Sequence, residues 1–278
     1  LVNGALSTNR NAGLLRKTAG AGLTTLAVPL DNSGTLDVQT GAILYAAGSA
    51  FRDGSSFTGA GLNLLAAEGV VTLEGAIHTD NLQLGGGNTV ITGVSTIDGV
   101  LTWTMGWIGG AADLTVATNG VLRVAGVDNK GLAGTLRNQG RLIWSGTGQI
   151  WQNAGVIDNQ AGGVFELQTD AALLVSGALS TNRNAGLITK TSGTGTIYLA
   201  VPLDNLGTLE VQTGAALYAA GSVFHDGSSF TGAGLNVLAA EGVVTLDGAI
   251  HTDNLQLAGG NTVIAGTSTI DGVLTWTM

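Results

Sequence analysis

The stretch Gly99-Val100-Leu101-Thr102-Trp103 contains the pattern from which the fold of this chain can be predicted. It has the form Gly-x-Φ-x-Φ, in which Φ is apolar. The same form returns as Gly120-Val121-Leu122-Arg123-Val124 and as Gly140-Arg141-Leu142-Ile143-Trp144. Alternation of apolar and variable residues predicts a β-strand with one buried face. The Φ side chains are therefore expected to point inward and the x side chains outward.

The glycines that open these segments recur at a nearly constant interval. Gly99, Gly120, Gly140 and Gly163 follow one another at intervals of roughly 20 to 23 residues. Intervals of this length are typical of solenoid coils, each of which stacks only on its neighbours. A β-propeller blade needs about 40 residues, and each glycine would destabilise a helix by about 1 kcal/mol. The spacing therefore predicts an all-β, parallel β-solenoid.

A longer repeat encloses the short one. Gly4-Ala5-Leu6-Ser7-Thr8 recurs as Gly177-Ala178-Leu179-Ser180-Thr181, each position matching the one numbered 173 higher, and 17 of the 102 paired positions differ. Residues 4–105 and 177–278 are thus near-identical copies, and 106–176 is the remainder of a 173-residue unit. Such a unit holds eight coils of about 21.6 residues. We predict a single continuous solenoid over 1–278, and both ends resemble cuts through a longer array because neither has a polar cap.

Asn-x-Gly motifs are expected to form the corners of the coils. Asn can hydrogen-bond to nearby backbone, and Gly adopts positive φ without strain. The asparagines of these motifs are Asn11, Asn32, Asn138, Asn153, Asn184 and Asn205. Asparagines at equivalent corners can stack into a ladder of side-chain amides along the axis. Pro29 and Pro202 are expected at strand ends or bulges, because proline removes a ladder hydrogen bond.

Composition narrows the classes of function. The 278 residues include 46 Gly, only 10% are charged, the net charge is −9, and there is no Cys. The lack of Cys excludes disulfide scaffolds, zinc–thiolate sites and Cys nucleophiles. Without a run of Lys or Arg, no nucleic acid is expected as a partner. No apolar run approaches the roughly 18 residues that a membrane helix needs, so we expect no membrane insertion of this segment.

Two runs of sequence resemble the repeats of very large bacterial surface proteins. They are Asn11-Ala12-Gly13-Leu14-Leu15-Arg16-Lys17-Thr18 and Ala27-Val28-Pro29-Leu30-Asp31-Asn32-Ser33-Gly34-Thr35-Leu36-Asp37-Val38-Gln39-Thr40-Gly41. More loosely, the whole chain resembles the solenoid shafts of filamentous-haemagglutinin-like and autotransporter adhesins. The resemblance implies a right-handed parallel β-helix, secretion to an extracellular or cell-surface location, and a role in adhesion or fibre formation. It carries over no catalytic residue.

Histidines and carboxylates are the first candidates for chemistry. His78 and His251 each precede an aspartate, Asp80 or Asp253, by two positions, so each His shares a strand face with a carboxylate that could orient it as a base. A surface or corner position is the preferred interpretation, and no specific role is expected for His225. A carboxylate pair of the glycan-cleaving kind would have to come from residues that are spread over several coils: Asp37, Asp53, Glu68, Glu74, Asp80 and Asp98.

Glycine-rich turns are the second group of candidates. Asp53-Gly54-Ser55 and Asp226-Gly227-Ser228 look like turns that could hold adventitious calcium, but the calcium-binding nonapeptide is absent. Gly85-Gly86-Gly87 lacks the Lys and Ser/Thr of a phosphate loop. A uniform Thr array, as in ice-binding solenoids, is not expected, because one template position holds Thr72, Arg123, Ile143 and Glu166.

Five tryptophans dominate the aromatic content. Trp103, Trp144 and Trp276 occupy inward Φ positions and are predicted to pack in the core. Trp107 and Trp151 lie near predicted turns, where an exposed indole could stack on a sugar or a partner. These two residues are the candidates for glycan binding through an aromatic face.

We therefore predict a structural repeat segment of a bacterial extracellular or cell-surface fibre or adhesin shaft. We expect no enzyme activity and no catalytic, cofactor-binding or metal site. The expected partner is a further solenoid end of the same kind, because a bare end exposes unpaired N–H and C=O groups. This contact would be made by end-to-end stacking or by continuation within one longer polypeptide. The alternative is a glycan-binding or glycan-cleaving β-helix domain, with surface glycans as the partner.

Overall fold

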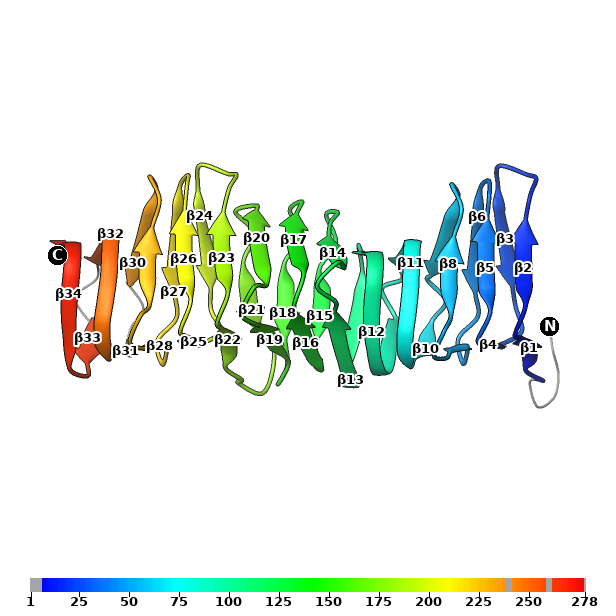
Figure 1. Ribbon diagram of the computed structural model, residues 1–278, viewed down its shortest axis with the longest axis horizontal. Coiled ribbons are helices and arrows are strands. Elements are labelled where there is room, and N and C mark those ends of the chain that lie inside the picture. The colour runs from blue at the N-terminus through cyan, green and yellow to red at the C-terminus, as the bar shows by residue number, and fades with distance from the viewer. Residues whose placement is uncertain (1–6, 239–241, 259–261, 278) are drawn as a thin grey trace.

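The chain folds into a rod of stacked coils. The computed structural model describes residues 7–238, 242–258 and 262–277. The strands within these ranges make a parallel β-solenoid of about 13 turns without helix. Figure 1 shows the coils following one another from the N-terminal end to the C-terminal end of the rod. The predicted all-β parallel solenoid is confirmed.

Each turn consists of three strands, which stack into three ladders along the rod; we name these the first, second and third face. The first face contains β1 (Asn9–Asn11), β4 (Leu30–Asn32), β7 (Ala50–Phe51), β10 (Gly69–Leu73), β15 (Lys130–Leu132), β18 (Ile150–Gln152), β21 (Leu173–Val175), β24 (Thr196–Leu199), β27 (Ala215–Tyr218) and β30 (Leu235–Leu238). The second face contains β2 (Leu14–Lys17), β5 (Thr35–Val38), β8 (Ser56–Thr58), β16 (Thr135–Asn138), β19 (Val156–Asn159), β22 (Asn182–Asn184), β25 (Leu203–Asn205), β28 (Val223–Phe224), β31 (Gly242–Leu246) and β33 (Thr262–Ala265).

The third face contains β3 (Leu23–Leu26), β6 (Ala42–Tyr45), β9 (Leu62–Leu65), β14 (Val121–Val124), β17 (Arg141–Ser145), β20 (Val164–Gln168), β23 (Leu187–Lys190), β26 (Thr208–Val211) and β29 (Ser229–Thr231). Five longer strands turn a corner without interruption and belong to more than one face: β11 (Gly75–Leu84), β12 (Thr89–Trp103), β13 (Gly106–Val116), β32 (Gly248–Ala258) and β34 (Ser268–Thr277). Pro29 and Pro202 lie immediately before β4 and β25, which confirms their predicted place at strand ends.

The interior of the rod is apolar and aromatic. Trp103 and Trp144 are 1% and 0% exposed, as predicted from their Φ positions. Their indole N–H groups donate to the carbonyls of Gly106 and Gly148, each at 3.2 Å. Trp276 also occupies an inward position, but it is 76% exposed, because it lies in the last coil and no described strand stacks over it. The predicted burial of Trp276 is therefore not realised in this chain.

An aromatic cluster inside the rod occurs once in each copy of the long repeat. Tyr45, Phe51 and Phe57 pack with ring centroids 5.0–6.3 Å apart, and the equivalent second set has centroids 5.0–6.2 Å apart: Tyr218, Phe224 and Phe230. Such edge-to-face contacts add to the energy of burial. Tyr218 Oη donates to Asn236 Oδ1 at 2.6 Å, so its polar end is satisfied inside the rod. Burial raises the pKa of both tyrosines above the usual range.

The two copies of the long repeat do not occupy the same faces. Asn11 pairs with Asn32 on the first face, whereas its equivalent, Asn184, pairs with Asn159 on the second face. In the same way β5 lies on the second face and its equivalent β26 on the third, and β6 lies on the third and its equivalent β27 on the first. Counted along the ladders, one long repeat makes eight turns and one third of a turn. About eight coils per repeat is confirmed, and the mean coil is slightly shorter than the sequence spacing had suggested, at about 21 residues.

The extra third of a turn arises between Gly34 and Gly99. Gly34 opens β5 on the second face, but Gly99 precedes the part of β12 that lies on the third face. The interval between these two glycines therefore spans three turns and a third. Coils are short here because β11 and β12 bend through the corners without a loop, so that Val90 already pairs with Trp107 in the next coil.

Side-chain amides form the predicted ladder at the corner between the second and third faces. Asn138 Nδ2 donates to Asn159 Oδ1, Asn159 to Asn184, and Asn184 to Asn205, each at 2.7 Å. Asn205 then donates to Ser228 Oγ at 3.0 Å. Two of these asparagines come from 106–176 and two from the second copy. The shift by one face is what brings them onto one line.

Candidate functional site

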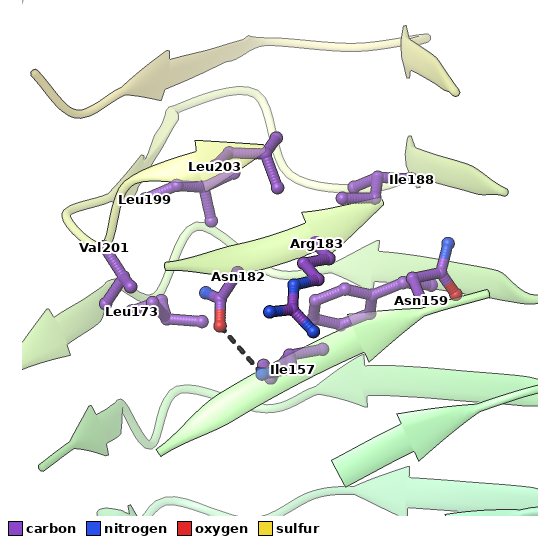
Figure 2. A pocket seen from close by; sticks show the side chains of 10 residues that line it. Ile157, Asn159, Leu173, Asn182, Arg183, Ile188, Leu199, Val201 and Leu203 are labelled. Atoms are coloured by element: carbon purple, nitrogen blue, oxygen red, sulfur yellow. Dashed lines mark hydrogen bonds between the residues drawn. The ribbon is translucent and has the colours of Figure 1, made fainter. Parts of the chain in front are cut away.

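Within the described residues, the structure has a small cavity inside the rod and hollows on its outside. The internal cavity measures about 20 Å³ and lies where β21, β22, β24 and β25 meet. Figure 2 shows Leu173, Leu199, Val201 and Leu203 around it, with Asn182 Oδ1 accepting a hydrogen bond from the Ile157 amide at 2.8 Å. A volume of this size holds at most about one water molecule. It is a packing defect between coils and offers no room for a ligand.

Two external hollows lie over corners of the coils. One, of about 630 Å³, follows the glycine-rich corner between the second and third faces and is lined by residues of successive coils that include Gly163, Gly186 and Gly207. Another, of about 500 Å³, lies over the corner after β20 beside Thr169 and Asp170. Both are open to solvent and expose mainly backbone and small side chains, so they provide few groups that could distinguish one ligand from another.

A third hollow contains the two tryptophans that the sequence placed near turns. We name it the aromatic pocket; its volume is about 250 Å³, and its lining is Trp107, Asn129, Lys130, Gly131, Trp151 and Ser176. All six residues belong to 106–176, the part of the chain that has no second copy. Trp107, Gly131 and Trp151 occupy the same position in three successive coils of the first face. The sequence identified the two indoles but not the four residues that complete the pocket.

Strand alternation directs both indoles outward. The neighbours of Trp107 and Trp151 along their strands include Ile108 and Ile150, each 1% exposed, so the tryptophans point to the opposite side of the sheet. Both are half-buried and lie near the start of strands β13 and β18, close to the turns that precede these strands, as predicted. They lie next to each other in space because stacking places residues 107, 131 and 151 on one line.

Gly131 makes room for the Trp107 ring. A Cβ atom on Gly131 would lie 2.0–2.3 Å from the ring carbons Cδ2, Cε3 and Cε2 of Trp107. Because real side chains never approach so closely, the indole can lie across this strand only if residue 131 is a glycine. The Trp107 ring thus covers the backbone of Gly131, which lies between Trp107 and Trp151. Gly131 is a necessary part of the pocket, although its φ is not in the left-handed region.

The polar groups of the aromatic pocket are few and partly free. Asn129 Oδ1 accepts from the Gln149 amide at 3.0 Å, and Ser176 Oγ donates to the Gln152 carbonyl at 3.2 Å. Within the part of the chain that the structure describes, Asn129 Nδ2 and Trp107 Nε1 donate to no protein acceptor. The pocket therefore presents two free N–H donors and a hydroxyl that can accept, all beside aromatic surface.

Lys130 lies at the inner side of the aromatic pocket. It is 1% exposed and its Nζ donates to the Asp128 carbonyl at 2.6 Å. Burial lowers the pKa of this amine below its ordinary value, and the Asp128 carboxylate opposes the shift. The other fully buried amine, Lys190, forms an ion pair with Asp170 at 2.8 Å. Among the described residues, Lys130 forms no such ion pair, and its hydrogen bond goes to a backbone carbonyl.

The histidines lie beside carboxylates on the exposed surface. His78 Nε2 is 3.5 Å from Asp80 Oδ1, as strand geometry predicted, and its Nδ1 is 3.6 Å from Asp98 Oδ2 in the next coil. The same arrangement recurs around His251, 3.4 Å from Asp253 and from Asp271. His78 and His251 are 47% and 48% exposed, so water competes for these contacts. The sequence did not predict that Asp98 and Asp271 lie beside these histidines, because both come from a neighbouring coil.

The remaining carboxylates have partners in adjacent coils. Asp37 Oδ2 accepts from Arg16 Nε at 2.7 Å, and Glu74 lies 2.5 Å from Arg52. Asp53 Oδ1 accepts from the Ala76 amide at 2.7 Å, and Asp226 does the same for Ala249, so these predicted turns cap the following coil. Glu68 accepts from Asn88 at 3.1 Å. Residues 7–238, 242–258 and 262–277 contain no cluster of three or more His, Asp or Glu side chains that could hold a metal ion.

Comparison of the sequence with protein families and with characterised proteins found no match. No family of proteins matches it, and no characterised protein resembles it closely enough in sequence to count as related. In the part of the chain that the structure describes, no helix has the length and apolar character to span a lipid bilayer.

Proposed function

We propose that this chain is a structural segment of a fibre or adhesin shaft that acts outside a bacterial cell. The observation that carries the proposal is the continuity of the rod. The ladders pass from the first copy through 106–176 into the second copy without a break in parallel pairing. Every coil is bound to the next by backbone hydrogen bonds and by a shared core, and such a rod resists bending and local unfolding.

The end coils support association along the axis. β34 pairs with β32 on one side, and on its other side no described strand covers it. Unpaired strand edges attract further strands, and the apolar Trp276 is 76% exposed on this end. We propose that another coil of the same kind covers this end, either from a second molecule or from continuation of the same polypeptide.

The low content of Lys and Arg, 10 in 278 residues, suits a rod exposed to trypsin-like proteases.

Electron microscopy of the native material, with diffraction analysis along any filament, tests this proposal. A continuous solenoid predicts a layer line near about 4.8 Å. In an array of 173-residue units, each unit rises by roughly 40 Å and rotates by one third of a turn, so the full axial repeat is about 120 Å. Stacking of separate 278-residue chains predicts instead a rise of about 64 Å. Discrete particles with no such repeat would contradict the shaft.

Location is tested separately. Antibodies raised against the folded 278-residue chain should label the surface of intact cells of the source organism, seen by immunogold microscopy. Permeabilised cells provide the control. Labelling that requires permeabilisation would overturn the extracellular assignment without affecting the fibre.

Catalysis on glycans, the alternative drawn from the sequence, is not proposed. Four of the six carboxylates considered for it contact an arginine, an asparagine amide or a backbone N–H group of a neighbouring coil. The other two, Asp80 and Asp98, flank the half-exposed His78, where water competes for the contact.

A further inference from the structure

The aromatic pocket has the chemical make-up of a site for a ring that is apolar on its faces and polar at its edge. Two indoles provide flat apolar surface. Because Gly131 has no side chain, the Trp107 ring can lie across the strand that separates the two tryptophans. The lining residues also carry hydrogen-bonding groups, namely Trp107 Nε1, Asn129 Nδ2 and Ser176 Oγ. A volume of about 250 Å³ is slightly below that of pockets for drug-sized molecules, roughly 300–1,000 Å³, and suits one or two sugar rings.

Electrostatics favours a ligand without charge. The lining contains no carboxylate that would bind a cation, and its one amine, Lys130, is directed to the Asp128 carbonyl. The chain as a whole carries a charge of −9, which repels anionic polymers. An apolar peptide would leave the two free N–H donors unpaired, and burial of unpaired donors lowers affinity.

We propose that the aromatic pocket binds a neutral saccharide, with a pyranose ring stacked against the indoles of Trp107 and Trp151. The ring C–H groups face the aromatic surface, and its hydroxyl groups pair with Asn129, Ser176 and the Trp107 indole N–H. This activity is independent of the shaft: a single 278-residue chain contains one complete pocket. In a tandem array of the proposed kind, successive pockets would lie about 40 Å apart along the rod and point in three directions.

Titration of the soluble 278-residue chain with hexasaccharides tests the site. Cellohexaose, mannohexaose and chitohexaose are added while tryptophan fluorescence and calorimetry are recorded. At least one is expected to bind saturably. Trp107→Ala and Trp151→Ala should each weaken it by about tenfold or more, whereas Trp151→Phe keeps an aromatic face and should lose less. Gly131→Ala should act like Trp107→Ala, because the methyl group displaces the ring.

Tyr198→Ala is the matched control. Tyr198 is another outward aromatic residue of the first face, 40% exposed and outside the pocket, so its removal should leave binding unchanged. Circular dichroism of each variant reports whether the coils remain folded. No saturable binding of any hexasaccharide up to about 10 mM, or equal binding by the Trp107 and Trp151 variants, would overturn the proposal. Trp151-dependent binding of an apolar dye without any saccharide binding would also overturn it.

Discussion

At the scale of the residue, one pair of positions that touch across coils has changed on both strands between the two copies. Arg16 and Asp37 form an ion pair in the first copy, and at the equivalent positions Thr189 donates to Glu210 at 2.7 Å. The side-chain chemistry has changed on both strands, yet a hydrogen bond between the coils is kept. The unit that is preserved is thus the cross-coil pair, which is also the unit of stabilisation in any sheet.

The asparagine ladder makes a prediction at this scale. Asn159 is buried, accepts from Asn138 and donates to Asn184, so Asn159→Ala leaves both neighbours without one partner. We expect the free energy of unfolding to fall by about 2 kcal/mol, measured by urea denaturation and by hydrogen exchange of the surrounding coils.

Asn153 provides the comparison. It belongs to the same Asn-x-Gly pattern, but its side chain is exposed and its Oδ1 accepts from the Ala178 amide. Asn153→Ala should lower stability by less than about 1 kcal/mol. Equal losses for the two variants would show that the buried ladder has no special role.

At the scale of the element, coil length varies while the pairing stays parallel. Among partners on adjacent coils, Val90 and Trp107 are the closest in sequence, and Leu173 and Leu199 are the furthest apart. The long coil bulges between β21 and β22, where Leu179 is 65% exposed. The cavity of about 20 Å³ lies against this coil, so the extra residues are accommodated with imperfect packing.

Filling this cavity should stabilise the rod. Val201 lines it, and Val201→Ile adds one methylene group where there is empty space. We expect a gain of about 0.5–1 kcal/mol in the free energy of unfolding, measured by the urea midpoint.

Val211→Ile is the control for that change. Val211 is 1% exposed and does not line the cavity, so the added group has no space and should destabilise by about 1 kcal/mol or more. A loss of similar size in Val201→Ile would mean that the cavity cannot accept the group.

At the scale of the whole molecule, the rod is a one-dimensional object in which each coil depends mainly on its two neighbours. Removal of residues 120–139 deletes β14, β15 and β16, one strand from each face, and joins Asn119 to Gly140 in place of Gly120. We expect a folded rod that is shorter by roughly 5 Å, measured by small-angle scattering, with an unchanged strand spectrum in circular dichroism.

Deletion of 130–139 alone gives the comparison. It removes β15 and β16 but keeps β14, so every later strand is displaced by one face. At the junction β17, β18 and β19 would then lie over parts of β13 and β14 that are not their native partners, and we expect a lower urea midpoint than for the deletion of 120–139. Equal midpoints for the two deletions would show that stability does not depend on which strands meet across coils.

The sequence alone determined the coil. The alternation of apolar residues and the recurring glycine predicted the strands, their parallel stacking and the burial of Trp103 and Trp144, because these features depend only on local periodicity. It also predicted the amide ladder, since equivalent corners must stack. It did not give the face on which a strand lies, because the three strands of a turn share the same alternation and a Gly can open any of them.

Only the tertiary structure decided which strands lie above one another. It showed that the long repeat ends one third of a turn beyond eight coils, which places Asn184 over Asn159. It also brought Trp107 and Trp151 to either side of Gly131, although each of the three belongs to a different coil. These contacts depend on the number of residues in each whole coil. A strand that bends through a corner without a loop shortens its coil, and the alternation of apolar residues within the strand does not reveal this.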